Sequence, residues 1–262
     1  MRLPRALLCC MTALLGFLSA CTASGAGASG APVAVASRSP RPLISSGPSA
    51  APAATPRVHE KELSARFSGA VLPFTPAFAR QLRRTTWHHG CPIPLRDLRM
   101  LRLRYWGFDH RVHQGLMEIN VTAAHDVVTV FHKLFRAGFE IKDMELAHRY
   151  IPGLPINHRS KADITDGFNC RPVVTARGAA PRWSMHSYGL AIDINQLQNP
   201  YVTRTGYVDD VYSRRYRNRS LHLPGMIHAG GVVVRAFASI GWHWGGAWTG
   251  DKDYMHFSSN GH

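Results

Sequence analysis

The sequence predicts an α+β domain in which helices flank a small antiparallel sheet. Residues 98–106 alternate between apolar and basic side chains, whereas residues 123–137 and 226–240 carry apolar side chains at the spacing of an amphipathic helix. Alternation places every second side chain on one face of a strand, and a spacing of three and four places side chains on one face of a helix. Strands and helices combined in this way make an α+β domain.

The first predicted strand covers residues 98–106, where Leu101, Leu103 and Tyr105 alternate with arginines. Such a pattern indicates a half-exposed strand, and residues 116–121 are its expected hairpin partner. A later strand is predicted at 190–195, with Ile192 and Ile194 on one face and Asp193 on the other.

The first predicted helix, at 123–137, has Asn120 or Thr122 as its expected cap and Gly138 as its stop. The second, at 226–240, stops before Gly241. Residues 151–170 are expected to form a loop, and residues 199–224 read as a long insertion rich in Asn, Tyr, Arg and Pro.

The N-terminal segment predicts export. Two arginines precede a short apolar run, as in a signal peptide over residues 1–20. Leu18-Ser19-Ala20-Cys21 resembles the bacterial lipobox, so Cys21 is the expected lipidation site and the protein is expected to face the cell wall as a membrane-anchored lipoprotein. An ordinary cleavable signal is the alternative. Residues 21–58, rich in Ala, Pro, Ser and Gly, are predicted to be a disordered linker, and residues 59–262 one folded domain.

The cysteines and the net charge indicate what kind of exported domain this is. Two cysteines in an exported domain predict a disulfide between Cys91 and Cys170, with a role for Cys170 as metal ligand or nucleophile as the alternative. The formal net charge is +15, and loss of Arg2 and Arg5 with the signal leaves +13. A domain this basic is attracted to anionic polymers, such as those of a cell wall. Nucleic acid is compatible with the charge alone, but export weighs against it.

Three residues have the types expected of a catalytic zinc site. His186 and Asp193 lie in one motif, Ser184 to Asp193, and His256 lies in a second, Asp253 to Phe257. Two imidazoles and one carboxylate form a ligand set of catalytic zinc, and the spare acid Asp253 suggests a general base. The chain has 15 histidines, so a hydrogen-bonded structural role for His186 is the alternative.

The spacing of the first motif excludes a continuous helix between its two ligands. His186 and Asp193 would then lie about 10 Å apart along the axis, which is too far for one zinc ion. A strand, a turn at Tyr188-Gly189 and a return strand can bring them together, while the fold must supply His256.

These motifs resemble the zinc D-alanyl-D-alanine carboxypeptidase family. The pattern Ser184-x-His186-x-x-Gly189-x-Ala191-x-Asp193, followed by Asp253-x-x-His256, is similar to that of vancomycin-resistance type D,D-peptidases and phage L-alanyl-D-glutamate endolysins. Its VanY-like branch is also suggested by three further stretches, namely Phe168-Asn169-Cys170-Arg171, Asp193-Ile194-Asn195 with Asn199-Pro200-Tyr201, and Gly241-Trp242-x-Trp244-Gly245-Gly246-x-Trp248. The resemblance covers roughly residues 87–258.

The resemblance implies a Hedgehog/D,D-peptidase-like fold and Zn²⁺ bound by His186, Asp193 and His256. It also implies Asp253 as the base, where many members carry Glu, and Arg171 as the cation that steadies the scissile carbonyl. Ser184 is expected either to bind substrate or to pair with backbone near the turn.

The implied function is hydrolysis of peptidoglycan stem peptides by a D-Ala-D-Ala carboxypeptidase, with a monomer expected. An L-Ala-D-Glu endopeptidase and a non-catalytic zinc-containing wall-binding domain are the alternatives. The tryptophans at 242, 244 and 248 either line the cleft or pack in the core. A third class, a nucleic-acid binder, rests only on the basic run 214–219, which is more typical of a solvated loop.

Overall fold

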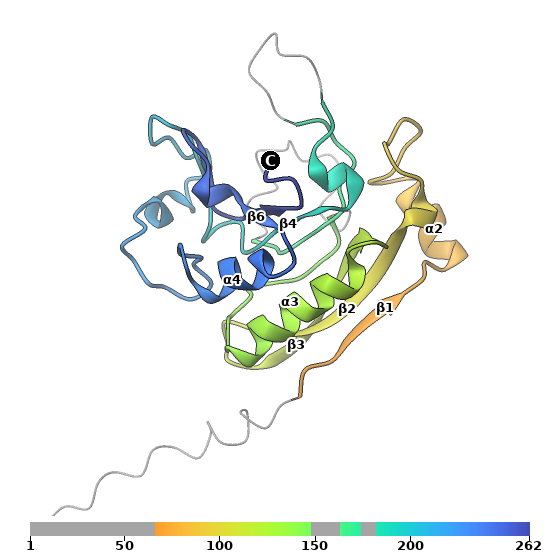
Figure 1. Cartoon of the computed structure of the whole chain (residues 1–262), viewed down its shortest axis with the longest axis horizontal. Helices are drawn as coiled ribbons and strands as arrows, with labels where there is room; N and C mark the ends of the chain where they lie inside the picture. Colours follow the sequence, from red (N-terminus) through yellow and green to blue (C-terminus); the bar gives the residue numbers. More distant parts are fainter. Residues whose placement is uncertain (1–65, 148–162, 174–181) are drawn as a thin grey trace, which may run out of the picture. The chain divides into compact units, whose positions relative to one another are not determined.

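The computed structural model describes residues 66–147, 163–173 and 182–262 of the chain (Figure 1). The predicted signal peptide, the lipidation site Cys21, the linker at 21–58 and most of the predicted loop at 151–170 lie outside the described residues. Among the described residues, no helix has the length and apolar character needed to cross a bilayer.

The larger sheet is antiparallel and has the order β1-β2-β3. Its strands are β1 (Gly69–Leu72), β2 (Leu98–Trp106) and β3 (Val112–Asn120). β2 has the predicted bounds, and its predicted hairpin partner is confirmed in a longer form as β3. Leu101, Leu103 and Tyr105 are buried, so the alternation in the sequence does mark the two faces of this strand.

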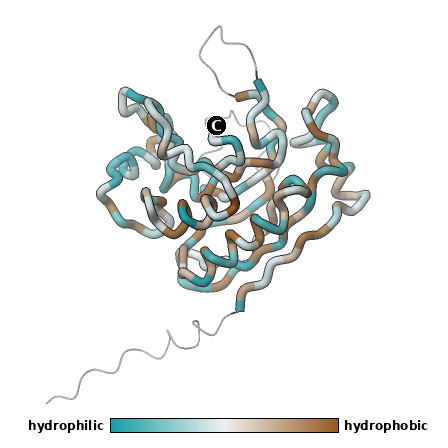
Figure 2. Tube along the Cα trace, in the orientation of Figure 1, coloured by the Kyte–Doolittle hydropathy of each residue, from teal (hydrophilic) through white to brown (hydrophobic). Residues whose placement is uncertain are grey.

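Helix α3 (Ala124–Arg136) packs against this sheet and against the shorter α4 (Val232–Ala238). Hydrophilic and hydrophobic residues alternate along α3 (Figure 2), and its apolar side chains belong to the main core. The predicted cap of α3 is wrong, since no side chain in the described parts of the chain caps its first turn. Asn120 instead binds Thr122 through its Oδ1 and donates its Nδ2–H to the carbonyl of Tyr188, 2.9 Å away. It thereby ties the end of β3 to the turn that carries His186.

The predicted helix at 226–240 begins later than expected. Gly230 has a φ of +68°, and the Gly231 N–H donates to the carbonyl of His228, so a turn occupies the residues before α4. Helix α2 (Pro76–Leu82), which the sequence patterns did not reveal, is capped by the Thr75 hydroxyl.

The smaller sheet has the order β4-β8-β6, with strands β4 (Ala191–Asp193), β8 (His256–Ser258) and β6 (His243–Trp244). A separate pair joins β5 (Tyr201–Val202) to β7 (Lys252–Asp253). Single-turn helices η1 (Leu95–Asp97), η4 (Met185–Tyr188), η5 (Arg214–Arg217) and η6 (Gly245–Ala247) connect these parts.

The predicted strand at 190–195 ends at Asp193 because Asn195 leaves the extended conformation. Asn195 has a φ of +48°, and its side chain accepts from Lys142 N and donates to the carbonyls of Glu140 and Gly225. This buried amide joins three segments directly behind the metal-ligand motif.

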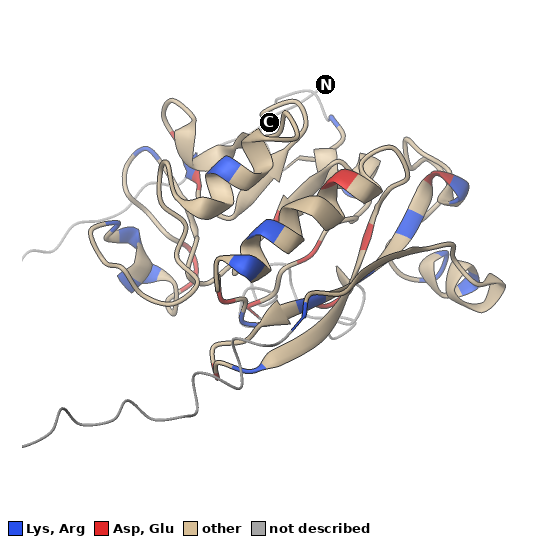
Figure 3. Ribbon diagram, turned by 60° about the horizontal axis from the view of Figure 1, so that its bottom comes forward, with Lys and Arg blue, Asp and Glu red and all other residues tan. Residues whose placement is uncertain are grey.

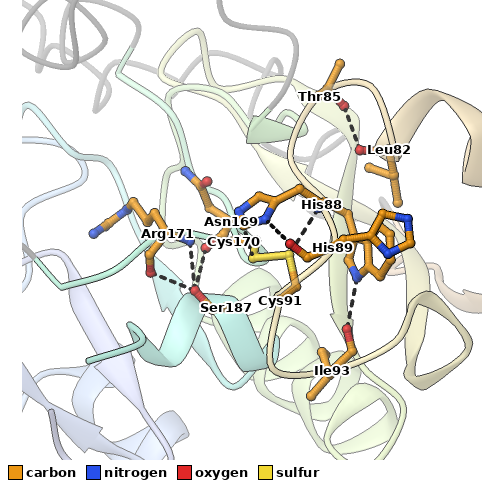
Figure 4. Close-up of a disulfide and its surroundings, with 11 residues drawn as sticks. Leu82, Thr85, His88, His89, Cys91, Ile93, Asn169, Cys170, Arg171 and Ser187 are labelled. Atoms are coloured by element: carbon orange, nitrogen blue, oxygen red, sulfur yellow. Dashed lines mark hydrogen bonds between the residues drawn. A yellow bond between two sulfur atoms is a disulfide. The ribbon is translucent and has the colours of Figure 1, made fainter. Parts of the chain in front are cut away.

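The predicted disulfide between Cys91 and Cys170 is present (Figure 4). It joins residues 79 positions apart and lies beside a second, smaller apolar cluster that includes Leu82, Leu98 and Phe168. The bridge holds the segment before the metal-ligand motif against the N-terminal part of the domain.

Candidate metal centre

The structure brings His186, Asp193 and His256 together at the smaller sheet. His186 comes from η4, Asp193 ends β4, and His256 begins β8 as the register partner of Asp193. His186 Nε2 lies 3.2 Å from Asp193 Oδ1 and 3.3 Å from His256 Nδ1, and the latter lies 3.0 Å from Asp193 Oδ1. All three residues are buried.

The size of this triangle fits a metal ion. Donor atoms about 2.0–2.1 Å from a tetrahedral zinc ion lie about 3.3 Å from one another, because a tetrahedron's edge is 1.63 times its radius. The three observed separations, 3.0 to 3.3 Å, are close to that edge.

The protonation of the triangle also favours a cation at its centre. His186 Nδ1 lies 2.6 Å from the carbonyl oxygen of Gly167, which only accepts, so Nδ1 carries a proton, and Nε2 of the neutral ring presents a lone pair. An ionised Asp193 presents lone pairs as well, and His256 Nδ1 can supply at most one proton to the triangle. With His186 in the neutral form that a metal ligand requires, at least two lone-pair atoms face each other at about 3 Å unless a cation lies between them. The residues present thus fit zinc.

Local backbone structure places His186 differently from the predicted strand. Residues 185–188 form the single turn η4, so the expectation of a strand before Tyr188-Gly189 is wrong, although the turn itself is confirmed. Gly189 has a φ of +63°, and a Cβ there would lie 2.7 Å from Asn120 N. Glycine is required at this position because the left-handed backbone also passes this close to β3.

The three residues influence one another's ionisation. Burial raises the pKa of Asp193, but the adjacent His186 and His256 lower it more, so the net shift is downward. Burial lowers the pKa of His256, but the hydrogen bond and charge of Asp193 raise it more. The carboxylate therefore stays ionised, as a metal ligand must.

The triangle lies at the wall of a cleft of about 1040 Å³. Arg171, Ser184 and Asp253 line the same cleft, so the structure gathers every residue of the predicted site in one place. Of the three tryptophans, Trp248 lines the cleft, whereas Trp242 and Trp244 are buried in the main core.

Asp253 reaches the cleft from β7, where it lies opposite Tyr201 of β5. Its Oδ1 is enclosed and has no hydrogen-bond partner among the described residues. Burial and the charge of Asp193 raise its pKa to about 7, although His256 and Arg171 oppose the rise. A carboxyl group with this pKa can both accept and release a proton near neutral pH.

The glycine at position 245, within the stretch from Gly241 to Trp248, is required by close packing. A Cβ on Gly245 would lie 2.6 Å from the carbonyl oxygen of Asp253 and 3.3 Å from the Cβ of His256. The absence of a side chain lets η6 lie directly against the strands that carry both residues.

Arg171 follows the disulfide residue Cys170, and its side chain extends away from the bridge (Figure 4). The backbone N–H of Arg171 donates to Ser187 Oγ at 2.8 Å, and that hydroxyl donates to the backbone carbonyl of Arg171 at 2.7 Å. The disulfide and Ser187 therefore fix the backbone on both sides of an arginine that lines the cleft.

Ser184 has the backbone role that the sequence allowed. Its Oγ accepts the N–H of His186 at 3.3 Å and caps η4. Ser184 also lines the cleft, and its contact with substrate stays a prediction.

Two site residues were missed by the sequence patterns. Gly167 supplies the carbonyl that orients His186, and the backbone of Asp166 pairs with that of Asp193 in both directions. The Asp166 carboxyl accepts Gln196 Nε2 at 3.0 Å, and burial and the charge of Asp193 raise its pKa. Backbone contacts leave no residue-type signal, so only the neighbouring Phe168-to-Arg171 motif pointed to this segment.

A second group of potential ligands, His88, Cys91 and Cys170, does not fit a metal. Its two sulfur atoms are bonded to each other and cannot act as thiolate ligands. This settles the alternative role of Cys170 in favour of the bridge.

Comparison with known proteins supports the resemblance. Residues 177–259 match the family model described as D-alanyl-D-alanine carboxypeptidase, a family of zinc peptidases. Searches of curated proteins and of solved structures each find no match for the chain. The predicted kinship to Hedgehog domains therefore stays a prediction, while the mixed helix-and-strand architecture with small antiparallel sheets is confirmed. The segment that contributes all three candidate ligands and Asp253 thus carries the sequence signature of the D-alanyl-D-alanine carboxypeptidase family of zinc peptidases.

Proposed function

We propose that this chain is an exported, lipid-anchored zinc peptidase that removes the terminal D-alanine from peptidoglycan stem peptides. The observation that carries the proposal is the placement of Asp253 in the same cleft as the ligand triangle, with an enclosed Oδ1 that no described residue binds. A structural zinc site requires ligands alone, whereas a hydrolytic site also requires a base.

His186, Asp193 and His256 would hold the metal, which as a Lewis acid polarises a carbonyl and lowers the pKa of water. Asp253 takes the proton of the attacking water and passes it to the leaving nitrogen, since it lines the same cleft as the ligand triangle. Arg171 supplies a positive charge for the carbonyl oxygen as negative charge develops on it.

The experiment is hydrolysis of defined stem peptides by the zinc-loaded full chain, with products identified by mass. Loss of one terminal D-Ala supports the carboxypeptidase, and a cut between L-Ala and D-Glu identifies the endopeptidase instead. Bound zinc with no hydrolysis of any stem peptide supports the non-catalytic alternative.

Asp253→Ala tests the assigned base directly. The variant is expected to keep its zinc and lose hydrolysis by at least about a hundredfold, the lower range for a general base. Asp126→Ala, at an exposed acid of α3, is the matched control and should retain full activity. Unchanged hydrolysis in Asp253→Ala would reject the role of this residue.

A further inference from the structure

Exposed aromatic side chains gather in one segment beside the cleft. We call residues 201–217 the arm, which begins with β5 and ends with η5. Among the described residues, five large apolar side chains are exposed, and four of these are in the arm: Tyr201 (42%), Tyr207 (55%), Val211 (59%) and Tyr212 (58%). Exposed apolar groups concentrated in this way mark a binding surface more often than scattered ones do.

Hydrogen bonds within the arm hold its backbone in one conformation. Thr203 N donates to the carbonyl of Tyr207 at 3.0 Å, and Tyr207 N donates to Thr203 Oγ1 at 3.0 Å. Arg217 Nη1 donates to the carbonyl of Gly206 at 2.8 Å, so η5 holds the tip of the turn. The exposed tyrosines are therefore presented from an ordered backbone, which reduces the entropy lost when they bind a partner.

The arm is basic on its exposed side. It contains four arginines and two aspartates, and Figure 3 shows basic residues on the single-turn helix η5. Both acids have partners within the arm, since Asp209 accepts the Tyr207 hydroxyl at 3.0 Å and Asp210 accepts Tyr212 N at 2.7 Å. Arg214 and Arg215 are exposed, and the guanidinium of Arg215 lies 4.8 Å from the ring of Tyr216. Exposed aromatic rings and exposed arginines therefore occur together in the arm.

The arm is continuous with the cleft. Tyr201 is the register partner of Asp253, and its hydroxyl donates to Asp251, which also accepts the N–H of Arg204 at 2.7 Å. Tyr201, Asp251 and Asp253 all line the cleft. A polymer whose side branch enters the cleft would therefore meet the arm next.

We propose that the arm binds the sugar chain of the polymer that carries the scissile peptide, namely a glycan with acidic peptide branches. This inference rests on the proposed function, because it takes the peptide in the cleft to be attached to such a chain. Tyrosine rings stack on the apolar faces of sugar rings, and arginines pair with the carboxylates of neighbouring peptide branches. Single-stranded nucleic acid offers stackable rings and negative charge as well, but only the glycan is covalently joined to a peptide that enters the cleft.

The experiment compares binding to the polymer with hydrolysis of a small peptide, using the full chain throughout. One variant combines Tyr207→Ser with Tyr212→Ser, and a second combines Arg214→Gln with Arg215→Gln. The matched control combines Val121→Ser with Arg136→Gln, an exposed apolar residue and an exposed arginine outside the arm. Co-sedimentation with purified, insoluble peptidoglycan measures binding, and a soluble stem peptide measures the cleft.

Each arm variant is expected to bind the insoluble polymer at least about tenfold more weakly, while its kcat/KM on the soluble peptide changes less than about twofold. The control should bind like the unmodified protein. Unchanged binding in both arm variants would overturn the inference, and so would equal arm-dependent binding to a single-stranded oligonucleotide at the same ionic strength. If no soluble peptide is cleaved but arm-dependent binding persists, the proposed hydrolysis fails and the glycan contact stands.

Discussion

Asp193 and His256 are direct register partners across β4 and β8, although 63 positions separate them in the chain. Their side chains lie on the same face of the pair, and Asp193 Oδ1 and His256 Nδ1 are 3.0 Å apart. Antiparallel pairing of two short strands therefore positions two of the three candidate ligands, and the turn after Ser184 positions the third.

Removal of one candidate ligand should strongly weaken zinc binding, whereas replacement of an unrelated histidine should leave zinc binding unchanged. We expect His256→Ala and Asp193→Asn each to weaken zinc binding by at least about a hundredfold, more than the loss of a ligand-orienting contact. Zinc should then no longer raise the melting temperature, because a ligand stabilises only the state that binds it. Zinc titration with thermal unfolding checks this, with His125→Ala, at an exposed histidine of α3, as the control. Equal zinc-dependent stabilisation of all three variants would contradict the ligand assignment.

Asp253 should give the metal-free protein a distinctive pH dependence. Its pKa is raised to about 7, mainly by burial, whereas an aspartate in the unfolded chain has a pKa of about 3.9. Between these values the folded state binds more protons, so this carboxyl's contribution to stability is complete below about pH 4 and lost as the pH rises through about 7.

The test compares urea unfolding of the metal-free protein and of Asp253→Asn at pH 5 and pH 8. The unmodified protein should lose more stability between these pH values than the variant does, by an amount on the order of a few kcal/mol. Identical losses in the two proteins would show that Asp253 is not the titrating group.

The Cys91–Cys170 bridge should stabilise the fold by constraining the unfolded chain. Closing a loop of 79 positions corresponds to about 4.5 kcal/mol in the chain-entropy treatment. We expect Cys91→Ser combined with Cys170→Ser to melt at a lower temperature than the unmodified protein. A reductant should lower the melting temperature of the unmodified protein and leave that of the double variant unchanged. A melting temperature that reductant does not alter in either protein would argue against the bridge.

Arg219 should be structural, unlike Arg214 and Arg215 in the same basic run. Its guanidinium donates to the carbonyls of Gln198 and Tyr216 and to Asn199 Oδ1, and it lies 4.4 Å from the ring of Tyr254. Arg219→Gln should reduce the free energy of unfolding by about 3 kcal/mol, because several buried acceptors lose a charged donor. Arg215→Gln, at an exposed position, should change it by less than about 0.5 kcal/mol. Denaturant unfolding measures both, and equal effects would refute the distinction.

Arg219 also shows what sequence patterns cannot predict, namely which arginine of a basic run is held by hydrogen bonds within the fold. The run 214–219 is typical of a solvated loop, which describes Arg214 and Arg215 but not Arg219. The strand β2 could be predicted because apolar and basic residues alternate along it with the period of a strand. Arg219 is held by backbone carbonyls from distant segments, and no residue type records them.

The candidate site divides in the same way. The grouping of His186, Asp193, His256 and Asp253 could be predicted because the metal binding and proton transfer that we propose require those side chains. The turn η4 could not, since a strand and a single helical turn both satisfy the short spacing before Gly189. The carbonyl of Gly167, which orients His186, was also hidden, because any residue supplies a carbonyl.

The position of β8 in the middle of the smaller sheet determines when the candidate metal centre can form. β8 carries His256 and lies between β4 and β6 in that sheet, yet it follows both of them in the chain. A nascent chain that has not yet released residue 258 therefore lacks both a ligand and the strand that would align the other two. The candidate metal centre therefore cannot assemble before β8 has been synthesised and has paired with both of its neighbours.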